Sequence, residues 1–237
     1  MNRDGVPMLK RFAQEVCSPL NTAMQQLDAA CQRLTHSPAQ PKQARLAIDL
    51  AMRELQRVAT LMEEFVLLAQ TRALHLERVD LHKFVEGIVV CLQPWANSSE
   101  VALEVTASGP LSVDIDSGLF EQVILSLLRN AVEASRPGGQ VHVSITRDSA
   151  GARVSVEDSG VGFSRDAAIF TPFYTTKTKG TGLSLAVAQR IVAHHAGSLE
   201  ATSEAGRTVF SVTLPAADSQ PSRVSLSVQE TLLDAAR

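Results

Sequence analysis

The sequence has few cysteines and few aromatic residues, and neither sign of charge dominates it. Its three cysteines, Cys17, Cys31 and Cys91, are far apart and lack the spacing of a disulfide framework or a zinc site. We expect them to be small apolar side chains in a reducing compartment. The formal net charge of −3 gives no electrostatic reason to expect nucleic acid as a partner. No run approaches the roughly 18 apolar residues of a membrane span, so we expect a cytoplasmic chain without a membrane segment.

A heptad pattern of apolar residues runs without interruption through residues 44–69. Its spacings alternate between four and three residues, which is typical of a long helix packed in a bundle. The same spacing occurs in residues 20–34, and H-S-P-A-Q-P separates the two stretches. We therefore predict an antiparallel helical hairpin. Because a lone hairpin leaves an apolar seam uncovered, we expect a homodimer that forms a four-helix bundle.

Beyond about residue 78 the pattern changes to the alternation that is typical of β-strands. The predicted strands include V-H-V-S-I-T and A-R-V-S-V-E, which R-D-S-A-G joins as a hairpin turn. Helices are predicted at residues 119–135 and 183–195, with Gly197 as the C′ residue of the second. This mixed order favours an α+β fold in which helices cover one face of a sheet, a two-layer sandwich. The predicted domains are 1–78 for the hairpin, 79–217 for the sandwich and 218–237 for a tail.

The first predicted helix of the sandwich carries a carboxamide within its apolar stripe. Leu127 and Asn130 share one helix face because they are three residues apart. Ser126 lies one turn before Asn130 and Glu133 follows it, so a polar row continues along that face. Such a row can hold a hydrated magnesium ion. The alternative is a buried, hydrogen-bonded asparagine with no ligand.

Two turns that contain glycine can let a ligand approach the backbone. V-S-V-E-D-S-G-V-G-F places Asp158 at the end of a predicted strand, where its carboxylate can accept a hydrogen bond from an amino group, and Gly160 and Gly162 follow. In K-T-K-G-T-G-L-S-L, Gly180 and Gly182 lead directly into a predicted helix, whose free N–H groups suit phosphate. Each turn alone is common, and an ordinary surface turn is the alternative.

These elements in this order, with F-T-P-F-Y-T-T-K between the two glycine turns, resemble the catalytic ATP-binding domain of two-component sensor histidine kinases. This is the Bergerat-type ATPase fold, which is also found in gyrases, and the resemblance covers residues 79–215. The family motifs correspond to an N box at 127–135, a first Gly box at 158–162, an F box at 169–177 and a second Gly box at 180–183. Two departures are Ser126, where the family usually has Asn, and the short segment between the first Gly box and the F box.

The resemblance implies that the chain binds ATP and Mg²⁺. Asn130 would be the metal ligand, and Asp158 would accept from the adenine amino group. The other implied nucleotide-binding residues are Gly160 and Gly162 beside the adenine, Phe170 and Phe173 as anchors of a lid, and Lys177, Gly180, Thr181, Gly182 and Leu183 near the phosphates.

The N-terminal stretch F-A-Q-E-V-C-S-P-L resembles the phosphoacceptor segment of the same family. The family box reads His-Glu, two variable residues, then Ser, Thr or Asn, then Pro and an apolar residue. Glu15 and Ser18 fit this box, as do the proline and leucine that follow, which places Gln14 at the phosphoacceptor position. Gln14 lies off the apolar stripe, with Ser18 one turn away on the same face. The resemblance implies that Glu15 is a general base.

A glutamine at the acceptor position changes the expected chemistry. The lone pair of a carboxamide nitrogen is delocalised into its carbonyl, so Gln14 cannot attack a γ-phosphoryl group as an imidazole does. We expect autophosphorylation at this position to be blocked. A deliberate substitution, a naturally degenerate kinase and a motif in the wrong register are three explanations. The fit of the neighbouring residues disfavours the third.

The leading hypothesis is the core of a sensor histidine kinase, a phosphotransferase that passes a phosphoryl group to an aspartate of a response regulator receiver domain. The alternative is a pseudokinase without an acceptor, acting as a response-regulator phosphatase or docking module. There Ser18, with the carboxamide of Gln14, would orient a water molecule. A dimeric scaffold without turnover and a serine/threonine kinase of the anti-sigma type rank below these two.

Overall fold

The contacts in the computed structural model divide the chain into two compact units. The described residues are 5–36, 41–69, 73–148, 151–164, 167–177, 180–204 and 206–215. The helical unit takes its described residues from Met1–Ala73 and Phe163–Ile191. The sheet unit takes its described residues from Leu74–Gly162 and Val192–Arg237.

The division does not follow the predicted domains, since the sheet unit begins at Leu74 and residues 163–191 are grouped differently. Residues 163–191, which the sequence pattern assigned to the ATP-binding domain, group with the N-terminal helices. The predicted boundary between residues 78 and 79 stays a prediction, and the predicted tail, 218–237, lies outside the described residues.

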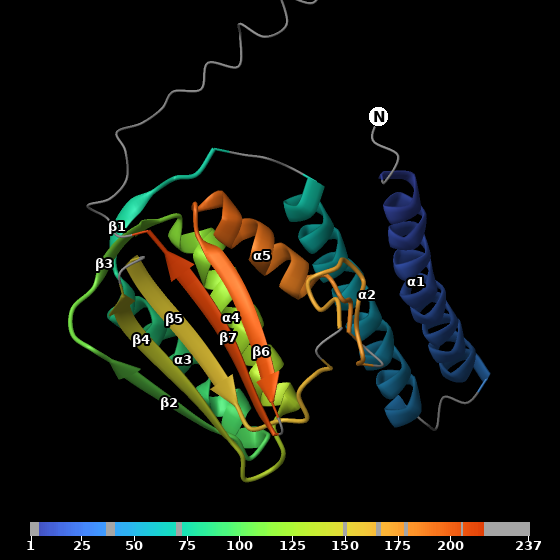
Figure 1. Cartoon of the computed structure of the whole chain (residues 1–237). Coiled ribbons are helices and arrows are strands. Elements are labelled where there is room, and N and C mark those ends of the chain that lie inside the picture. Colours follow the sequence, from blue (N-terminus) through green and yellow to red (C-terminus); the bar gives the residue numbers. More distant parts are fainter. Residues whose placement is uncertain are drawn as a thin grey trace, which may run out of the picture. The chain divides into compact units, whose positions relative to one another are not determined.

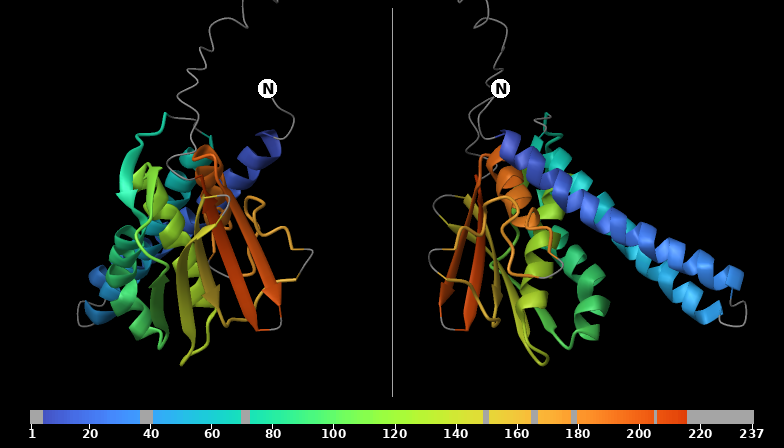
Figure 2. Two further views of the ribbon diagram at one scale, coloured as in Figure 1. Left: turned by 60° about the vertical axis from the view of Figure 1, so that its left-hand side comes forward. Right: turned by 90° about the vertical axis from the view of Figure 1, so that its right-hand side faces the viewer.

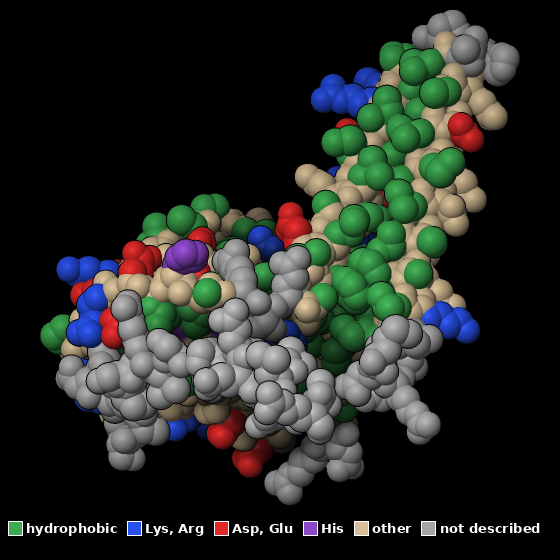
Figure 3. Space-filling view, turned by 90° about the horizontal axis from the view of Figure 1, so that it is seen from above, with side chains coloured by type: hydrophobic (Ala, Val, Ile, Leu, Met, Phe, Trp, Pro, Cys, Tyr) green, Lys and Arg blue, Asp and Glu red, His purple; other side chains and the backbone are tan. Residues whose placement is uncertain are grey.

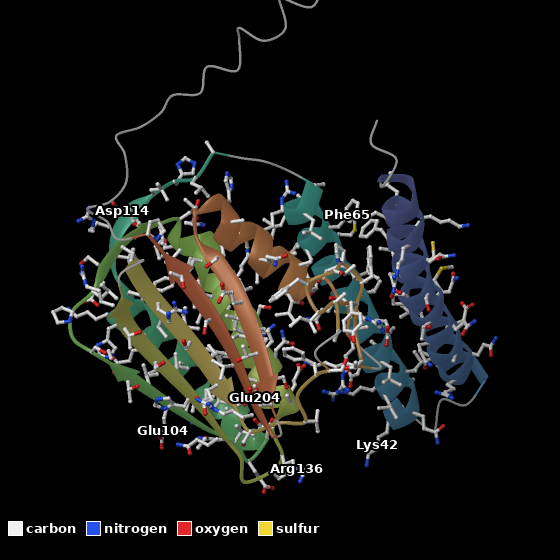
Figure 4. All side chains as sticks on the ribbon, in the orientation of Figure 1. Lys42, Phe65, Glu104, Asp114, Arg136 and Glu204 are labelled. Atoms are coloured by element: carbon white, nitrogen blue, oxygen red, sulfur yellow. The ribbon has the colours of Figure 1, made fainter. Side chains whose placement is uncertain are left out.

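Two long helices, α1 (Gly5–His36) and α2 (Pro41–Ala69), lie side by side as an antiparallel hairpin, which confirms the predicted N-terminal helical region (Figures 1 and 2). Alanines form much of their contact, and Ala23, Ala44 and Ala51 are no more than 2% exposed. Small side chains let the two backbones approach closely. Near the open end of the hairpin, Phe65 of α2 stacks on Phe12 of α1, with ring centroids 3.9 Å apart (Figure 4).

Only half of the heptad seam on α2 is covered within the chain. Ala44, Ala51 and Val58 are buried against α1, whereas the alternate members of the seam are exposed. The exposed fractions are 39% for Ile48, 39% for Leu55 and 53% for Met62. Hydrophobic side chains accordingly run along the surface of the hairpin (Figure 3). An apolar strip of this length needs a partner surface in water.

The sheet unit is built on a five-stranded mixed sheet in the order β2-β4-β5-β7-β6 (Figure 1). The strands are β2 (Ala102–Ala107), β4 (Gln140–Asp148), β5 (Gly151–Asp158), β6 (Ser198–Glu204) and β7 (Arg207–Leu214). The β2–β4 pair is parallel and the other pairs are antiparallel, including the predicted β4–β5 hairpin. A separate short pair joins β1 (Glu77–Asp80) to β3 (Ser112–Ile115).

Helices α3 (Leu81–Ser98) and α4 (Ser117–Ala134) cover one face of this sheet (Figure 2). Along β5 the residues alternate, so that Val154 and Val156 are fully buried while Glu157 is partly exposed. Phe120 and Leu127 of α4 are also fully buried. The predicted α+β fold, with helices on one sheet face, is confirmed. None of the helices in the described ranges is long and apolar enough to cross a bilayer.

Helix α3 and strand β1 were not predicted. Asp80 caps α3 by accepting hydrogen bonds from the backbone N–H groups of His82 and Lys83, and Leu81, Val85 and other apolar residues of this helix are buried. The apolar spacing of four and three that marks α1 and α2 is also present here, but over fewer turns, and Pro94 near the end of α3 weakens the helical signal.

The last helix, α5 (Ser184–His194), ends one residue earlier than predicted. Ala196 has a left-handed φ of 57°, the conformation that was predicted for Gly197 as the C′ residue. The N–H of Gly197 donates to the carbonyl of Val192 and that of Ala196 to Ala193, both at 3.0 Å, which is a Schellman arrangement. The prediction that Gly197 is the C′ residue was wrong. Gly197 is needed for another reason, because a Cβ there would collide with the carbonyl oxygen of Thr213.

We expect Ala196→Gly to raise the free energy of unfolding by about 0.5–1 kcal/mol, because glycine adopts a positive φ without the steric cost that alanine carries. Ala193 lies three residues earlier, within α5, so Ala193→Gly should lower the free energy of unfolding. Denaturant unfolding of both variants, followed by circular dichroism, measures the two changes. A fall in stability for Ala196→Gly would contradict the left-handed conformation at this residue.

Candidate functional site

A buried polar pair lies at the end of β5 in the sheet unit. Asp158 is 2% exposed, and its Oδ1 accepts a hydrogen bond from the N–H of Gly160 at 2.8 Å. Thr208 of β7 pairs with Asp158 across the sheet and is 3% exposed. Among the described residues, the Oγ1 of Thr208 finds no hydrogen-bond partner. A buried hydroxyl of this kind is costly, which favours a ligand or water as its partner.

The two glycines that follow Asp158 are required by close contacts. A Cβ at Gly160 would lie 2.5 Å from the carbonyl oxygen of Ala134, at the end of α4. Gly162 has a φ of 69°, and a Cβ there would collide with the hydroxyl of Ser203. Both glycines therefore let the loop pack against the chain itself, at Ala134 of α4 and at Ser203 of β6. The predicted approach of a ligand at these glycines stays a prediction.

The polar row predicted on α4 is present, with different degrees of exposure. Asn130 is half-buried, Glu133 is exposed, and the Oγ of Ser126 is buried without a hydrogen-bond partner in the part of the chain that the structure describes. In that same part, no three His, Cys, Asp or Glu side chains come together. A magnesium ion here would therefore depend on Asn130, on water and on ligand phosphates, which suits the few protein oxygens that magnesium usually takes.

The second Gly box belongs to the helical unit, where it precedes α5. Gly182 has a φ of 67°, and a Cβ there would lie 2.5 Å from the carbonyl carbon of Phe173. The N–H of Phe173 donates to the carbonyl of Gly182 at 2.8 Å, which ties the F box to this turn. Thr181 accepts from the N–H of Leu183 at 3.3 Å. A Cβ at Gly180 would also lie too close to the hydroxyl of Thr175 in the F box.

The predicted nucleotide-binding residues of the helical unit differ in exposure. Phe173 is 4% exposed and Leu183 is fully buried, and both form an apolar cluster with Leu61 of α2. Phe170 is half-buried and Lys177 is exposed. Phe173 therefore anchors its segment on the hairpin, and Leu183 packs in the core of the unit.

Glu64 of α2, a residue that the sequence did not single out, contacts the second Gly box. Its carboxylate accepts from the hydroxyl of Thr181 at 2.8 Å and from that of Ser184 at 2.5 Å. Burial raises the pKa of Glu64, and the negative charge of Glu63 acts in the same direction, while the two hydroxyl bonds act to lower the pKa. A carboxyl with a raised pKa stabilises the folded state most at acidic pH and loses that contribution as the pH rises through its pKa.

The predicted phosphoacceptor segment lies on α1. Gln14 and Ser18 are exposed and one turn apart, and Glu15 is half-buried. Pro19 is buried within the helix, which continues through it. The heptad pattern therefore predicted the exposure of Gln14 correctly.

The structure brings the predicted nucleotide-binding residues into two groups. Asn130, Asp158 and the first pair of glycines belong to the sheet unit, and the F box and second Gly box belong to the helical unit. Sequence reasoning missed Thr208 and Glu64. A threonine at the start of a strand and a glutamate on a charged helix carry no local signal, and only the three-dimensional contacts reveal them.

Comparison with known proteins shows which proteins this chain resembles. Residues 115–218 match the family described as histidine kinase-, DNA gyrase B-, and HSP90-like ATPase. Sensor histidine kinase ZraS of Escherichia coli (strain K12) is 34% identical over 207 residues, which are 86% of this chain and 44% of that protein. Sporulation kinase E of Bacillus subtilis (strain 168) is 31% identical over 175 residues, 72% of this chain and 24% of that protein. The chain thus spans less than half the length of these curated relatives.

Solved structures show the same fold. The catalytic domain of histidine kinase ThkA matches 60% of this chain and 97% of that chain, with a TM-score of 0.57 and 26% identity. The structure of histidine kinase ThkA in complex with the response regulator protein TrrA matches 92% of this chain and 65% of that chain, with a TM-score of 0.75 and 21% identity.

We expect Thr208→Val to raise the free energy of unfolding by about 1 kcal/mol, because valine has a similar shape and removes a buried hydroxyl that lacks a partner. Thr213→Val is the matched control, since this threonine lies on the same strand but is partly exposed on the other face. Its effect should stay within about 0.5 kcal/mol. Chemical denaturation measures both, and a loss of stability for Thr208→Val would show that the hydroxyl has a partner in the folded protein.

Proposed function

We propose, from the premise that this chain belongs to the sensor histidine kinases and carries their ATPase domain, that it binds Mg-ATP but cannot phosphorylate itself at position 14. Its partner would be the receiver domain of a response regulator. The observation that carries the proposal is a buried Asp158–Thr208 pair beside two sterically required glycines, together with an exposed Gln14 at the acceptor position.

The sheet unit supplies the groups that suit an adenine ring. The buried carboxylate of Asp158 is an acceptor for the adenine amino group, and the Thr208 hydroxyl next to it is available for a further hydrogen bond. Gly160 and Gly162 let the loop after Asp158 pack closely against Ala134 and Ser203, which fixes the backbone beside the carboxylate. Asn130 would hold Mg²⁺, which neutralises phosphate charge.

The helical unit supplies the groups that suit phosphate. Gly180, Thr181 and Gly182 lie immediately before the N-terminus of α5, an 11-residue helix whose free N–H groups favour an anion. The exposed ammonium group of Lys177 adds a positive charge in the same segment. Phosphoryl transfer depends mainly on such positioning and charge neutralisation.

Gln14 stops the reaction at its first step. In a kinase of this family a nitrogen lone pair attacks the γ-phosphorus and the bond to the leaving oxygen of ADP breaks. The carboxamide nitrogen of Gln14 offers no such lone pair, and Glu15 has no acidic proton to remove there. The exposed position of Gln14 rules out burial as the obstacle, so the obstacle is chemical.

The exposed seam on α2 supports a homodimer. Ile48, Leu55 and Met62 leave a strip that a second hairpin of the same sequence would cover, completing a four-helix bundle. A histidine kinase of similar fold forms a complex with a response regulator protein, which supports a receiver domain as a further partner of this chain.

A second candidate function is dephosphorylation of that response regulator. Gln14 and Ser18 are both exposed and one turn apart on α1, so a carboxamide and a hydroxyl point from one helix face. Together they can orient a water molecule for attack on an aspartyl phosphate. The P–O bond to the aspartate would break, which releases inorganic phosphate and restores the carboxylate.

We expect Gln14→His to incorporate phosphate from γ-labelled ATP in an acid-labile form, and the chain with Gln14 to incorporate none. The reason is that only imidazole supplies the nucleophile. Nucleotide binding is measured for both proteins at the same time. If neither protein is labelled although both bind ATP, the kinase proposal is wrong, and the phosphatase or docking function takes its place.

We expect Asp158→Asn to weaken ATP binding by about tenfold or more, because the carboxamide can present a donor to the adenine amino group where the carboxylate accepts. Glu157→Gln is the matched control, since this carboxylate is the preceding residue and bonds to Arg207 on the open face of the sheet. Isothermal titration calorimetry measures both affinities. Equal affinities in the two variants would place the adenine elsewhere.

A further inference from the structure

One acidic side chain of the hairpin reaches a motif to which the proposed function assigns phosphate. Glu64 lies three residues after Leu61 and four before Leu68, so all three share one face of α2. Leu61 and Leu68 pack in the apolar cluster that also contains Phe173 and Leu183. Glu64 is the polar residue on this face of α2, and Glu64 and the cluster all belong to the helical unit.

The chemistry of this contact is that of an anion at a helix N-terminus. The two oxygens of the Glu64 carboxylate accept from Thr181 at 2.8 Å and from Ser184 at 2.5 Å, at the start of α5. Hydroxyl donors and free N–H groups at a helix N-terminus are also the groups that bind phosphate. A hydroxyl has only one proton to donate, so Thr181 cannot donate to Glu64 and to a phosphate at once.

We propose that Glu64 is an internal competitor of the nucleotide. Its carboxylate occupies Thr181 and Ser184 in the absence of ATP, and the phosphates must displace it before the second Gly box can bind them. This contact, the Glu64 latch, consists of Glu64, Thr181 and Ser184. It rests on the proposed function, in which Thr181 binds phosphate.

A second contact within the helical unit also joins the hairpin to residues 163–191. The Nη2 of Arg11 on α1 donates to the carbonyl of Phe173 at 2.9 Å, and its guanidinium lies 5.4 Å from the centre of the Phe173 ring. Arg11 is three residues before Gln14, so the acceptor helix itself holds the F box. Both hairpin helices therefore contact residues 163–191, α1 at the F box and α2 at the second Gly box.

The latch must be weak enough for a ligand to open. Burial of Glu64 disfavours its charged form, so the two hydroxyl bonds are partly offset by the cost of removing the carboxylate from water. A nucleotide binds the fraction of molecules whose latch is open, and its apparent affinity falls in proportion to that fraction. Because such coupling is reciprocal, ATP would in turn loosen the hold of the hairpin on residues 163–191.

The test compares nucleotide affinities in the full chain by calorimetry. Glu64→Gln keeps the shape of the side chain but removes its charge, and we expect ATP to bind about tenfold more tightly. Adenosine has no phosphates, so its affinity should be the same in all of these proteins.

Glu63→Gln is the matched control, because it removes the same charge from the adjacent residue, which is exposed and makes no contact with the latch hydroxyls among those described. Its affinity for ATP should stay close to that of the parent chain. Circular dichroism confirms that each variant is folded.

The possible results separate the latch from the site on which it rests. If Glu64→Gln and the parent chain bind ATP equally, while Asp158→Asn binds it poorly, the latch is wrong and the ATP site stands. If adenosine affinity rises as much as ATP affinity, competition with phosphate is wrong. If no variant binds ATP, including the parent chain, the proposed function fails and the latch fails with it.

Discussion

The close approach of one loop to the end of α4 fixes the polar end of strand β5 in the sheet unit. The backbone at Gly160 passes so near the carbonyl oxygen of Ala134 that only hydrogen fits between them. This approach fixes the loop against α4, and the N–H of Gly160 then satisfies one oxygen of the buried Asp158. A carboxylate buried to this degree needs such donors. The position of this loop, and one hydrogen-bond donor to the buried carboxylate, follow from this steric constraint.

Local patterns predicted most of the fold and the residues of the family motifs. The heptads of α1 and α2 and the alternation along β4, β5 and β7 extend over enough residues to identify each element. Helix α3 was missed because its apolar pattern covers fewer turns than those of α1 and α2, and because the helix contains a proline. Thr208 and Glu64 could not be predicted, because their significance comes from contacts with residues far away in the sequence, 117 positions in the case of Glu64 and Thr181.

Gly160 of the sheet unit and Gly182 of the helical unit are required for different reasons. At Gly160 a side chain would strike a backbone carbonyl, so the limit is space rather than backbone conformation. At Gly182 the backbone has a positive φ, and the F box lies against the position of the missing side chain. Sequence motifs record both requirements with the same letter. The structure distinguishes the two requirements. A substitution at Gly160 would clash with a carbonyl oxygen, whereas one at Gly182 would also strain the backbone.

The half-covered seam of α2 has a consequence for how stability is defined in this chain. Ile48, Leu55 and Met62 remain exposed on a helix whose other face is packed against α1. Whatever molecule covers them binds the folded hairpin and not the unfolded chain. By mass action, the free energy of unfolding of the helices then depends on the logarithm of the concentration of that molecule. For the helical unit, a melting temperature is therefore a property of a solution at a stated concentration and not of one isolated chain.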